Sequence, residues 1–283
     1  MIKSIVRILI LFIFFAFVLF PILWIISFSF KEEADIVTYP PKFIFKPTLY
    51  NYIANFTGKV KASTGVFFES KPKLPLYIKN TLILTLGTLL LTALVGIPAS
   101  YSLAKLKVRG KQHISFLLLS FRFLPELAVI LPIYILYNRF NLFDTYYGLI
   151  WIYQLITLPL FVLIMRSFFQ DIPQDIIDAA YVDGASPMKT LIRVVMPLCG
   201  PGIAAASILC FIFAWNSFQF ALILGASRTQ PITIGLLTYI SFQEIQRGRM
   251  AAAATIGIIP SIIFAIISHK FIVRGLTLGA VKE

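Results

Sequence analysis

The sequence predicts an all-α, polytopic membrane protein with six spanning helices. Hydrophobic residues make up 59% of the 283 residues and charged residues only 13%, and the mean hydropathy is +0.88. A soluble domain would carry about twice that share of charge. Six apolar segments are long enough to cross a bilayer. They lie near residues 7–30, 76–105, 113–138, 146–169, 201–225 and 250–273.

The first segment follows Lys3 and Arg7 and continues to residue 30. It is too long for the core of a signal peptide and has no small-residue cleavage site, so it predicts an uncleaved spanning helix. The segment 31–75 is rich in Pro, Lys and aromatic residues. It predicts an external loop, either a contact surface for an extracellular partner or a solvated cap. We therefore divide the chain into an N-terminal helix with its loop, 1–75, and a five-helix core, 76–283.

The second and third segments carry polar residues within apolar runs. Threonines and glycines recur in the second segment, where they let membrane helices approach closely, and Pro98 predicts a kink. The third segment holds Arg122 and Glu126. Four residues apart on a helix, these two share a face and are able to pair. Because charge at bilayer depth is costly, the pattern leaves three interpretations: a structural ion pair, an ordinary interfacial feature or a proton relay.

The segment 171–200 predicts a helix–turn–helix between the fourth and fifth spans. Asp171 with Gln174 forms the pattern of a capping box. Gly184 supplies a left-handed residue to end that helix. Ser186 then begins a second helix, and Pro197 ends it. From these residues alone, a capped amphipathic helix on the membrane surface is an equally valid interpretation.

Polar residues of the fifth span define a candidate substrate path. Trp215, Asn216 and Gln219 fall within about 100° of the helix circumference. Polar side chains at this depth face the bundle or a water-filled path. An amide beside an indole also suits a sugar ring, which needs hydrogen-bond partners and an aromatic surface. Hydrogen bonding between helices is the alternative interpretation.

The apolar run 232–242 is too short to cross a bilayer. It predicts a segment that dips into the outer face between the fifth and sixth spans. Tyr239 and Gln243 then become candidates for an outer gate, and Tyr239 joins the candidate substrate path.

Several functional classes are excluded by the sequence. The net charge of +13 comes from basic residues clustered between apolar spans, as flanking residues of membrane helices are, so nucleic-acid binding is not predicted. Cys199 and Cys210 provide no disulfide framework, and His113 and His269 lie at membrane edges without a metal-binding cluster. No phosphate-binding loop motif occurs. The chain is therefore predicted not to be an enzyme by itself and to hold no cofactor or metal.

The 171–200 segment resembles the signature of the permeases of binding-protein-dependent ABC importers. In that family, Glu-Ala-Ala, two variable residues and Asp-Gly-Ala come before a Leu-Pro. Here Asp178 replaces the Glu and Met196 replaces the Leu. The resemblance implies that this coupling loop docks in a groove of a separate ATPase subunit. The implied coupling residues are Asp178, Ala179, Ala180, Asp183, Gly184, Ala185 and Pro197.

A second resemblance lies in the fifth span and at the C-terminus. Residues 215–221 read Trp-Asn-Ser-Phe-Gln-Phe-Ala and are similar to the Trp-Asn-x-Phe-x-Phe-Ala run of the maltose-type carbohydrate permeases. Residues 274–282 are similar to the Arg-Gly-Leu-Thr-x-Gly-Ala-Val-Lys ending of those permeases. The resemblance implies the fold of type I ABC importer permeases. It also implies contacts near the ATPase at Gly279, Ala280 and Lys282.

Together these resemblances imply the permease subunit of an ATP-driven importer for a carbohydrate, such as a di- or oligosaccharide or a polyol. The implied partners are a second permease subunit in a heterodimer, two ATPase subunits that bind ATP and Mg²⁺, and an extracellular solute-binding protein. The implied location is the plasma membrane of a prokaryote, with both termini cytoplasmic. Lys and Arg divide evenly between the two sides, so the coupling loop sets this orientation and the charge count does not.

Two alternatives from other classes stay open at the level of sequence. The main one is an ion-coupled secondary transporter that uses Arg122 and Glu126. Such carriers usually show an inverted internal repeat, and the sequence has none that we find. The other is a non-transporting membrane scaffold, which would leave the coupling loop unexplained.

Overall fold

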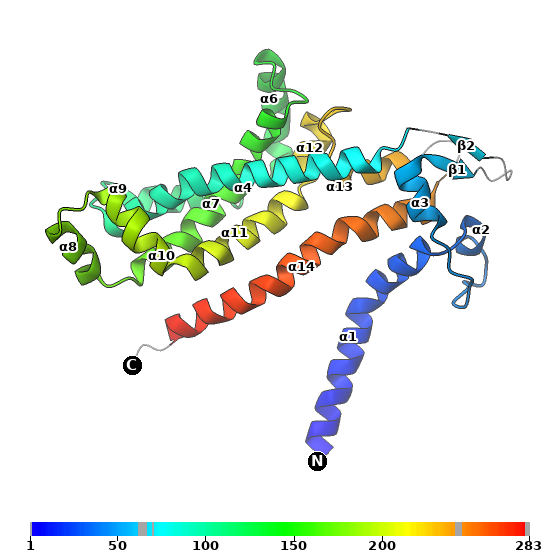
Figure 1. Ribbon diagram of the computed structural model, residues 1–283, viewed down its shortest axis with the longest axis horizontal. Coiled ribbons are helices and arrows are strands. Elements are labelled where there is room, and N and C mark those ends of the chain that lie inside the picture. The colour runs from blue at the N-terminus through cyan, green and yellow to red at the C-terminus, as the bar shows by residue number, and fades with distance from the viewer. Residues whose placement is uncertain (1, 62–66, 70, 241–244, 281–283) are drawn as a thin grey trace. The chain divides into compact units, whose positions relative to one another are not determined.

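The computed structural model describes residues 2–61, 67–69, 71–240 and 245–280, which are almost entirely helical (Figure 1). The described chain divides into two compact units. The first unit comprises Met1–Ile78 and Ile232–Ile259, and the second comprises Lys79–Pro231 and Pro260–Glu283. Two long helices, α4 (Leu74–Lys105) and α14 (Arg247–Ala280), continue from one unit into the other.

The first unit begins with α1 (Ile2–Ser29), which is apolar on every side. Its side chains are largely exposed, among them Phe12 at 73% and Phe17 at 79%. A helix of this length with no polar face is suited to contact with lipid all round. The shorter elements of this unit are α2 (Glu33–Ile36), α3 (Tyr50–Thr57), the antiparallel pair β1 (Lys59–Lys61) and β2 (Phe67–Glu69), α13 (Ile232–Gly235) and η2 (Leu236–Tyr239).

Buried polar side chains hold the 31–61 loop of the first unit in place. Asn51 Nδ2 donates to the carbonyls of Ser29 at 3.0 Å and Lys31 at 2.8 Å. Glu33 Oε2 accepts the backbone N–H of Gly248 at 3.1 Å, in the first turn of α14. A carboxylate at a helix N-terminus satisfies an N–H that has no partner within the helix. These bonds give the predicted external loop a fixed structure.

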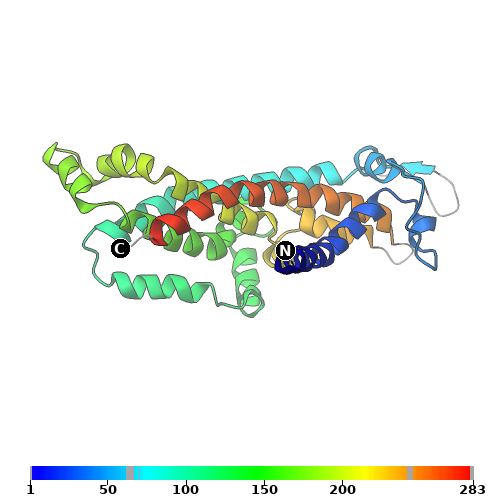
Figure 2. The ribbon, with the colours of Figure 1, turned by 90° about the horizontal axis from the view of Figure 1, so that it is seen from below.

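The second unit contains the helices of the core and the loop 171–200. The core helices are α5 (Lys111–Phe121), α6 (Glu126–Arg139), α7 (Tyr146–Gln170), α11 (Gly200–Trp215) and α12 (Gln219–Leu224), together with most of α4. The loop contains α8 (Gln174–Val182), α9 (Pro187–Thr190), the π turn η1 (Leu191–Val195) and α10 (Met196–Leu198). Helices α4, α7 and α11 run alongside one another (Figure 2).

Small residues allow α4 and α7 to pack closely, as the sequence predicts. A Cβ atom at Gly96 would collide with the ring of Phe161 on α7. Within the same contact, the buried Thr92 hydroxyl lies 2.8 Å from Gln154 Oε1 and 2.9 Å from Thr157 Oγ1. The small and hydroxyl residues of α4 therefore form a packing face, with hydrogen bonds that satisfy polar groups inside an apolar bundle.

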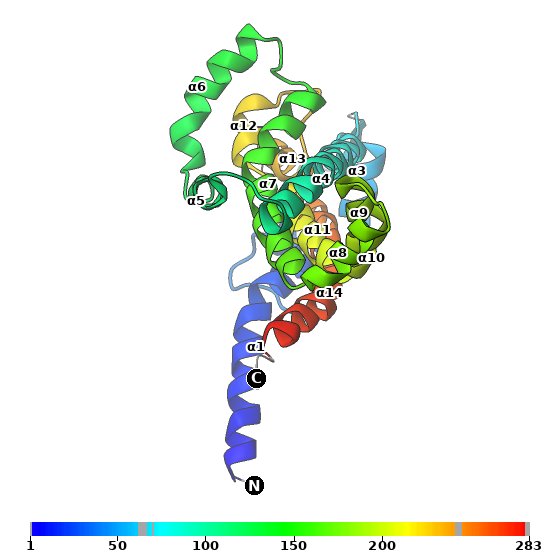
Figure 3. The same cartoon turned by 90° about the vertical axis from the view of Figure 1, so that its left-hand side faces the viewer.

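Two predicted spans are wrong as continuous helices. Among the described residues, four helices are long and apolar enough to cross a membrane, and six spans result if each of two bent pairs counts as one. The predicted span 113–138 is α5 followed by α6, bent by 95° (Figure 3). Pro125 lies at this bend, where it cannot continue α5. The predicted span 201–225 is interrupted because α11 ends at Trp215 and α12 begins at Gln219.

Candidate functional site

The coupling loop begins differently from the prediction. Asp171 closes α7, with its N–H bonded to the carbonyl of Ser167 at 3.3 Å, and it does not cap α8. Its ψ angle of −15° is helical, whereas an N-cap residue needs an extended backbone. Helix α8 starts at Gln174, whose side chain donates to Asp178 Oδ1 at 3.0 Å. The predicted capping box is therefore wrong, because Asp171 belongs to the end of α7 and Pro173 is the residue that precedes α8.

The turn at the centre of the loop matches the prediction. Gly184 has a φ of +78°, and its N–H bonds to the carbonyl of Tyr181 at 3.0 Å. The next N–H, of Ala185, bonds to the carbonyl of Ala180 at 2.9 Å, which completes a glycine-type helix end. Ser186 then caps α9, since its hydroxyl accepts the N–H of Lys189 at 3.4 Å. The left-handed residue and the second helix start are both confirmed.

The second helix of the loop ends at Leu198, one residue after the predicted stop at Pro197. The chain stays helical to Leu198 because it passes through the π turn η1 before the proline, with the N–H of Met196 bonded to the carbonyl of Leu191. A proline lacks an N–H and its ring crowds the carbonyl four residues earlier, so a wider turn accommodates it. The direction changes only afterwards, by 84° between α10 and α11.

The loop has an inner face that belongs to the core and an outer face that is exposed. Ile177, Leu191 and Val195 are 2% exposed or less and pack in one cluster with Phe169 at the end of α7. On the outer face, Val182 is 87% exposed. Of the predicted coupling residues, Asp178, Ala179, Asp183, Gly184 and Pro197 are exposed, Ala185 is half-buried and Ala180 is buried. The outer face of the loop therefore exposes Asp178, Asp183 and Val182, while its inner face is packed in the buried cluster at the end of α7.

Two side chains from α4 tie this loop to the bundle, and the sequence analysis missed both. Lys105 Nζ donates to the carbonyls of Ile172 at 2.5 Å and Gln170 at 3.3 Å, at the C-terminal end of α7. The hydroxyl of Tyr101 lies 3.4 Å from that of Tyr181 on α8. A cation beside the last carbonyls of a helix is favourable. The only sequence signal for Lys105 was its place in a basic cluster after the second span.

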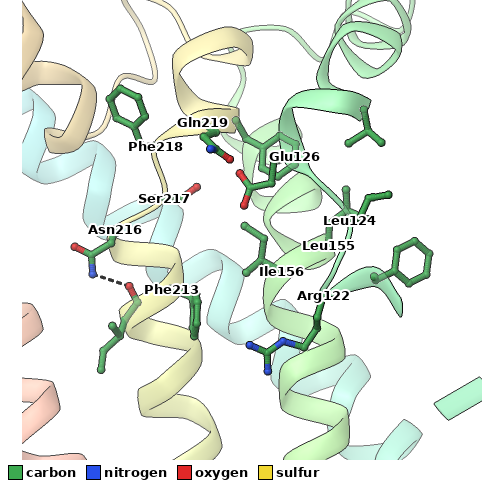
Figure 4. A pocket seen from close by; sticks show the side chains of 14 residues that line it. Arg122, Leu124, Glu126, Leu155, Ile156, Phe213, Asn216, Ser217, Phe218 and Gln219 are labelled. Atoms are coloured by element: carbon green, nitrogen blue, oxygen red, sulfur yellow. Dashed lines mark hydrogen bonds between the residues drawn. The ribbon is translucent and has the colours of Figure 1, made fainter. Parts of the chain in front are cut away.

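A cavity of about 560 Å³ lies where the two core helices are broken (Figure 4). Its polar lining comes from the α5–α6 break, with Arg122 and Glu126, and from the α11–α12 break, with Asn216, Ser217 and Gln219. Non-helical backbone at membrane depth is tolerated where it is buried in protein or lines a water-filled space. The two breaks therefore fit a hydrated cavity.

Arg122 and Glu126 do not share a helix face. Arg122 closes α5 and Glu126 opens α6, so the 95° bend separates them. The Arg122 guanidinium lies 5.9 Å from the ring centre of Phe213, and no ion pair joins the two charged residues within the described part of the chain. The predicted pairing on one helix face is wrong. The ion-pair hypothesis and the ion-coupled transporter hypothesis lose the geometry on which they were based.

The predicted substrate-path residues separate into two groups. Asn216 and Gln219 line the cavity, but Trp215 is 3% exposed and stacks on Phe211 with ring centres 5.4 Å apart. The prediction that Trp215, Asn216 and Gln219 share one polar helix face is wrong, because α11 ends at Trp215. Asn216 contributes to that ending, since its side chain donates to the carbonyl of Ile212 at 2.8 Å and competes with regular helical bonding.

Tyr239 belongs to the first unit and is described there by itself. It is 7% exposed, with the Arg249 guanidinium 5.4 Å from its ring centre. Burial raises the pKa of Tyr239 to about 12. Gln243, the other predicted gate residue, lies outside the described residues. The predicted tail contacts fall at the end of α14, which reaches Ala280, and Lys282 also lies outside the described residues.

The broken helices around a partly polar cavity and the helix–turn–helix packed on their base define an integral-membrane transport subunit. Residues 96–278 match the family of binding-protein-dependent transport system inner membrane components. The chain belongs to this family. It is therefore a multi-pass permease of an ABC importer, as the resemblance of the coupling loop predicts.

Individual relatives agree with this assignment. The chain is 33% identical to the trehalose/maltose transport system permease protein MalG of Thermococcus litoralis, over 93% of this chain and 91% of the relative. It is 34% identical to the trehalose transport system permease protein SugB of Mycobacterium tuberculosis, over 94% and 93%. The fold is similar to that of a chain in the crystal structure of a bacterial ABC transporter involved in the import of the acidic polysaccharide alginate. That match has a TM-score of 0.78 at 22% identity and covers 95% of this chain and 96% of the other.

Proposed function

We propose that this permease imports a carbohydrate, such as a di- or oligosaccharide or a polyol, and forms half of the translocation path. The support comes from relatives named for trehalose and maltose transport, which match more than nine-tenths of the chain at one-third identity. The amide side chains of Asn216 and Gln219 at the cavity suit a substrate rich in hydroxyl groups. The other half of the path comes from a second permease subunit.

The remaining partners are two ATPase subunits, which bind ATP and Mg²⁺, and an extracellular solute-binding protein. ATP hydrolysis belongs to the ATPase subunits, so this chain carries no catalytic residue. The coupling loop faces the cytoplasm to meet an ATPase, which places both termini on the cytoplasmic side. The exposed carboxylates of Asp178 and Asp183 are polar anchors for that contact, and the small residues beside them permit close approach.

The observation that carries this mechanism is the continuity of the loop with the core. The inner residues Ile177 and Val195 share a buried cluster with Phe161 and Phe169 of α7, and Cys210 of α11 belongs to the same cluster. A densely packed core transmits displacement with little compression. Movement imposed on the loop by an ATPase therefore reaches α7 and α11, whose residues line the cavity, and alternates access to it.

Co-purification tests this proposal. The chain is purified in mild detergent from its native host, and the proteins bound to it are identified by mass spectrometry. Wild type is expected to bring down an ATPase and a second permease. Asp183→Lys should lose the ATPase and keep the permease, whereas Asp171→Lys, a matched charge reversal at the base of the loop, should keep both. A wild-type chain that elutes alone would refute the importer assembly.

A further inference from the structure

Glu126 presents an unpaired carboxylate to the cavity. It is the first residue of α6 and is half-buried. Within the described part of the chain, its carboxylate has no hydrogen-bond donor and no cationic partner. A charge at membrane depth without a protein partner is costly, and residues of this kind mark substrate or ion pathways.

The groups beside Glu126 are neutral and polar. Figure 4 shows the side chains of Ser217 and Gln219, from the α11–α12 break, directed toward the same space as the Glu126 carboxylate. Behind them, Tyr153 is 1% exposed and its phenol lies against Ser217. On the cavity side this group offers the Glu126 carboxylate as an acceptor and the Gln219 amide, which both donates and accepts, while the oxygens of Ser217 and Tyr153 are buried behind them.

The positive charge of the cavity is placed elsewhere. The Arg122 guanidinium packs over the ring of Phe213, and Figure 4 shows it apart from the Glu126 group. The polar group around Glu126 therefore carries a net negative charge. A carboxylate accepts short, strong hydrogen bonds from hydroxyl groups. It repels a carboxylate or phosphate on a ligand, and like charges brought together strongly oppose binding.

We infer that Glu126 contacts the transported molecule and selects neutral, hydroxyl-rich sugars over anionic sugars. This inference rests on the proposed carbohydrate function and adds the charge class of the substrate to it. Sugar hydroxyls donate to Glu126 and bond with the amide of Gln219, while the phenyl rings of the cavity lining, Phe213 and Phe218, cover the apolar face of the sugar. The cavity volume of about 560 Å³ lies within the range of small-molecule sites.

The test uses the assembled transporter with its partner subunits. ATP-driven uptake of maltose and of trehalose is first measured in proteoliposomes with the solute-binding protein present. Equilibrium binding is then measured on the complex in nanodiscs without the solute-binding protein, so that the selectivity of that protein does not contribute. The probes are maltose and maltobionate, which differ by one carboxylate, and trehalose and trehalose 6-phosphate, which differ by one phosphate.

Wild type is expected to bind each neutral sugar in preference to its acid. Glu126→Gln keeps the shape of the side chain and removes its charge, so it should weaken binding of the neutral sugar by about tenfold, the loss of one charge-assisted hydrogen bond. The preference for the neutral sugar over its acid should also fall. Glu69→Gln is the control, because Glu69 lies in β2 outside the cavity, and it should behave as wild type.

The outcomes separate this inference from the proposed function. If the wild-type complex takes up neither these two sugars nor any other di- or oligosaccharide or polyol under ATP, the carbohydrate function fails and the inference fails with it. If uptake is normal but Glu126→Gln leaves both the affinity and the preference unchanged, the inference alone is refuted. A wild-type complex that binds the acids as tightly as the neutral sugars, with binding lost in Arg122→Gln, would instead make Arg122 the selective residue.

Discussion

The carboxylate of Asp144 accepts both the hydroxyl of Thr229, at 2.7 Å, and its backbone N–H, at 3.0 Å. The same carboxylate accepts the N–H groups of Ala226 at 2.9 Å and Arg228 at 3.2 Å. One side chain after α6 thus organises the whole turn that follows α12. The two broken helices that border the cavity are fixed to each other at this point, since α6 leads into Asp144 and α12 leads into Thr229.

Replacing this carboxylate should destabilise the second unit. Asp144→Ala leaves several donors without an acceptor and places alanine at a φ of +52°, so we expect a loss of about 2–4 kcal/mol. Asp144→Asn keeps one acceptor oxygen and tolerates the left-handed backbone, so its loss should be smaller. Thermal unfolding in detergent measures both. Glu69→Ala, which removes an exposed ion pair with Lys59, is the control and should cost less than about 1 kcal/mol. Equal unfolding temperatures for all variants would contradict the role of Asp144.

The turn of the coupling loop gives a second prediction. Gly184→Val places a β-branched residue at a φ of +78°, which costs of the order of 1–3 kcal/mol of local strain. No atom of this chain lies within 4 Å of a Cβ there, so the strain is in the backbone and the core should stay intact. We expect the variant to assemble in the membrane and to lose stimulation of ATP hydrolysis by substrate.

The matched control for this turn is Gly200→Ala. Gly200 also has open space around a Cβ, but it begins α11 with an ordinary helical backbone. This variant should keep wild-type stimulation in an ATPase assay of the reconstituted complex. If Gly184→Val retains full stimulation and full uptake, the turn does not need its left-handed residue.

Lys105 supplies a third prediction, about coupling between α4 and the loop. Lys105→Met keeps the length of the side chain and removes its bonds to the carbonyls of Ile172 and Gln170. We expect the ATPase to remain bound, because the outer face of the loop is unchanged, and the sugar transported per ATP to fall several-fold. Lys107→Met is the control, since Lys107 is exposed in the next turn. A normal transport ratio with Lys105→Met would mean that α4 moves independently of this tether.

The features that sequence predicts well here are those decided by a few neighbouring residues. The left-handed Gly184 and the Ser186 cap follow from local backbone chemistry, and the apolar spans follow from the thickness of the bilayer. The break after Trp215 was missed because the polar residues Asn216 and Gln219 also fit one face of a continuous helix, and no proline or glycine marks the break. The amide of Asn216 contributes to the break by bonding to the carbonyl of Ile212 in its own helix. Hydropathy alone does not detect that competition.

Contacts between distant segments of the chain also could not be predicted from the sequence. Asp144 and Thr229 are 85 residues apart in the chain, and nothing near either residue indicates the other. The same holds for Lys105 and Ile172, because a lysine after a membrane span is ordinary as a flanking residue. The prediction for Arg122 and Glu126 failed because their local spacing was read as if the helix were continuous. Their spacing of four implies a shared face only if the helix continues, and Pro125 lies between them.

The π turn η1 has a consequence for how the loop meets its partner. A π turn corresponds to one residue inserted into an α-helix. Deleting one residue between Leu191 and Val195 would restore α-helical spacing and rotate everything before it by about 100° relative to α11. Val182 and Asp183 would then point in another direction with no change in their identity. The direction in which the coupling surface faces is therefore set by the number of residues in η1, and inserting or deleting one residue there would change it.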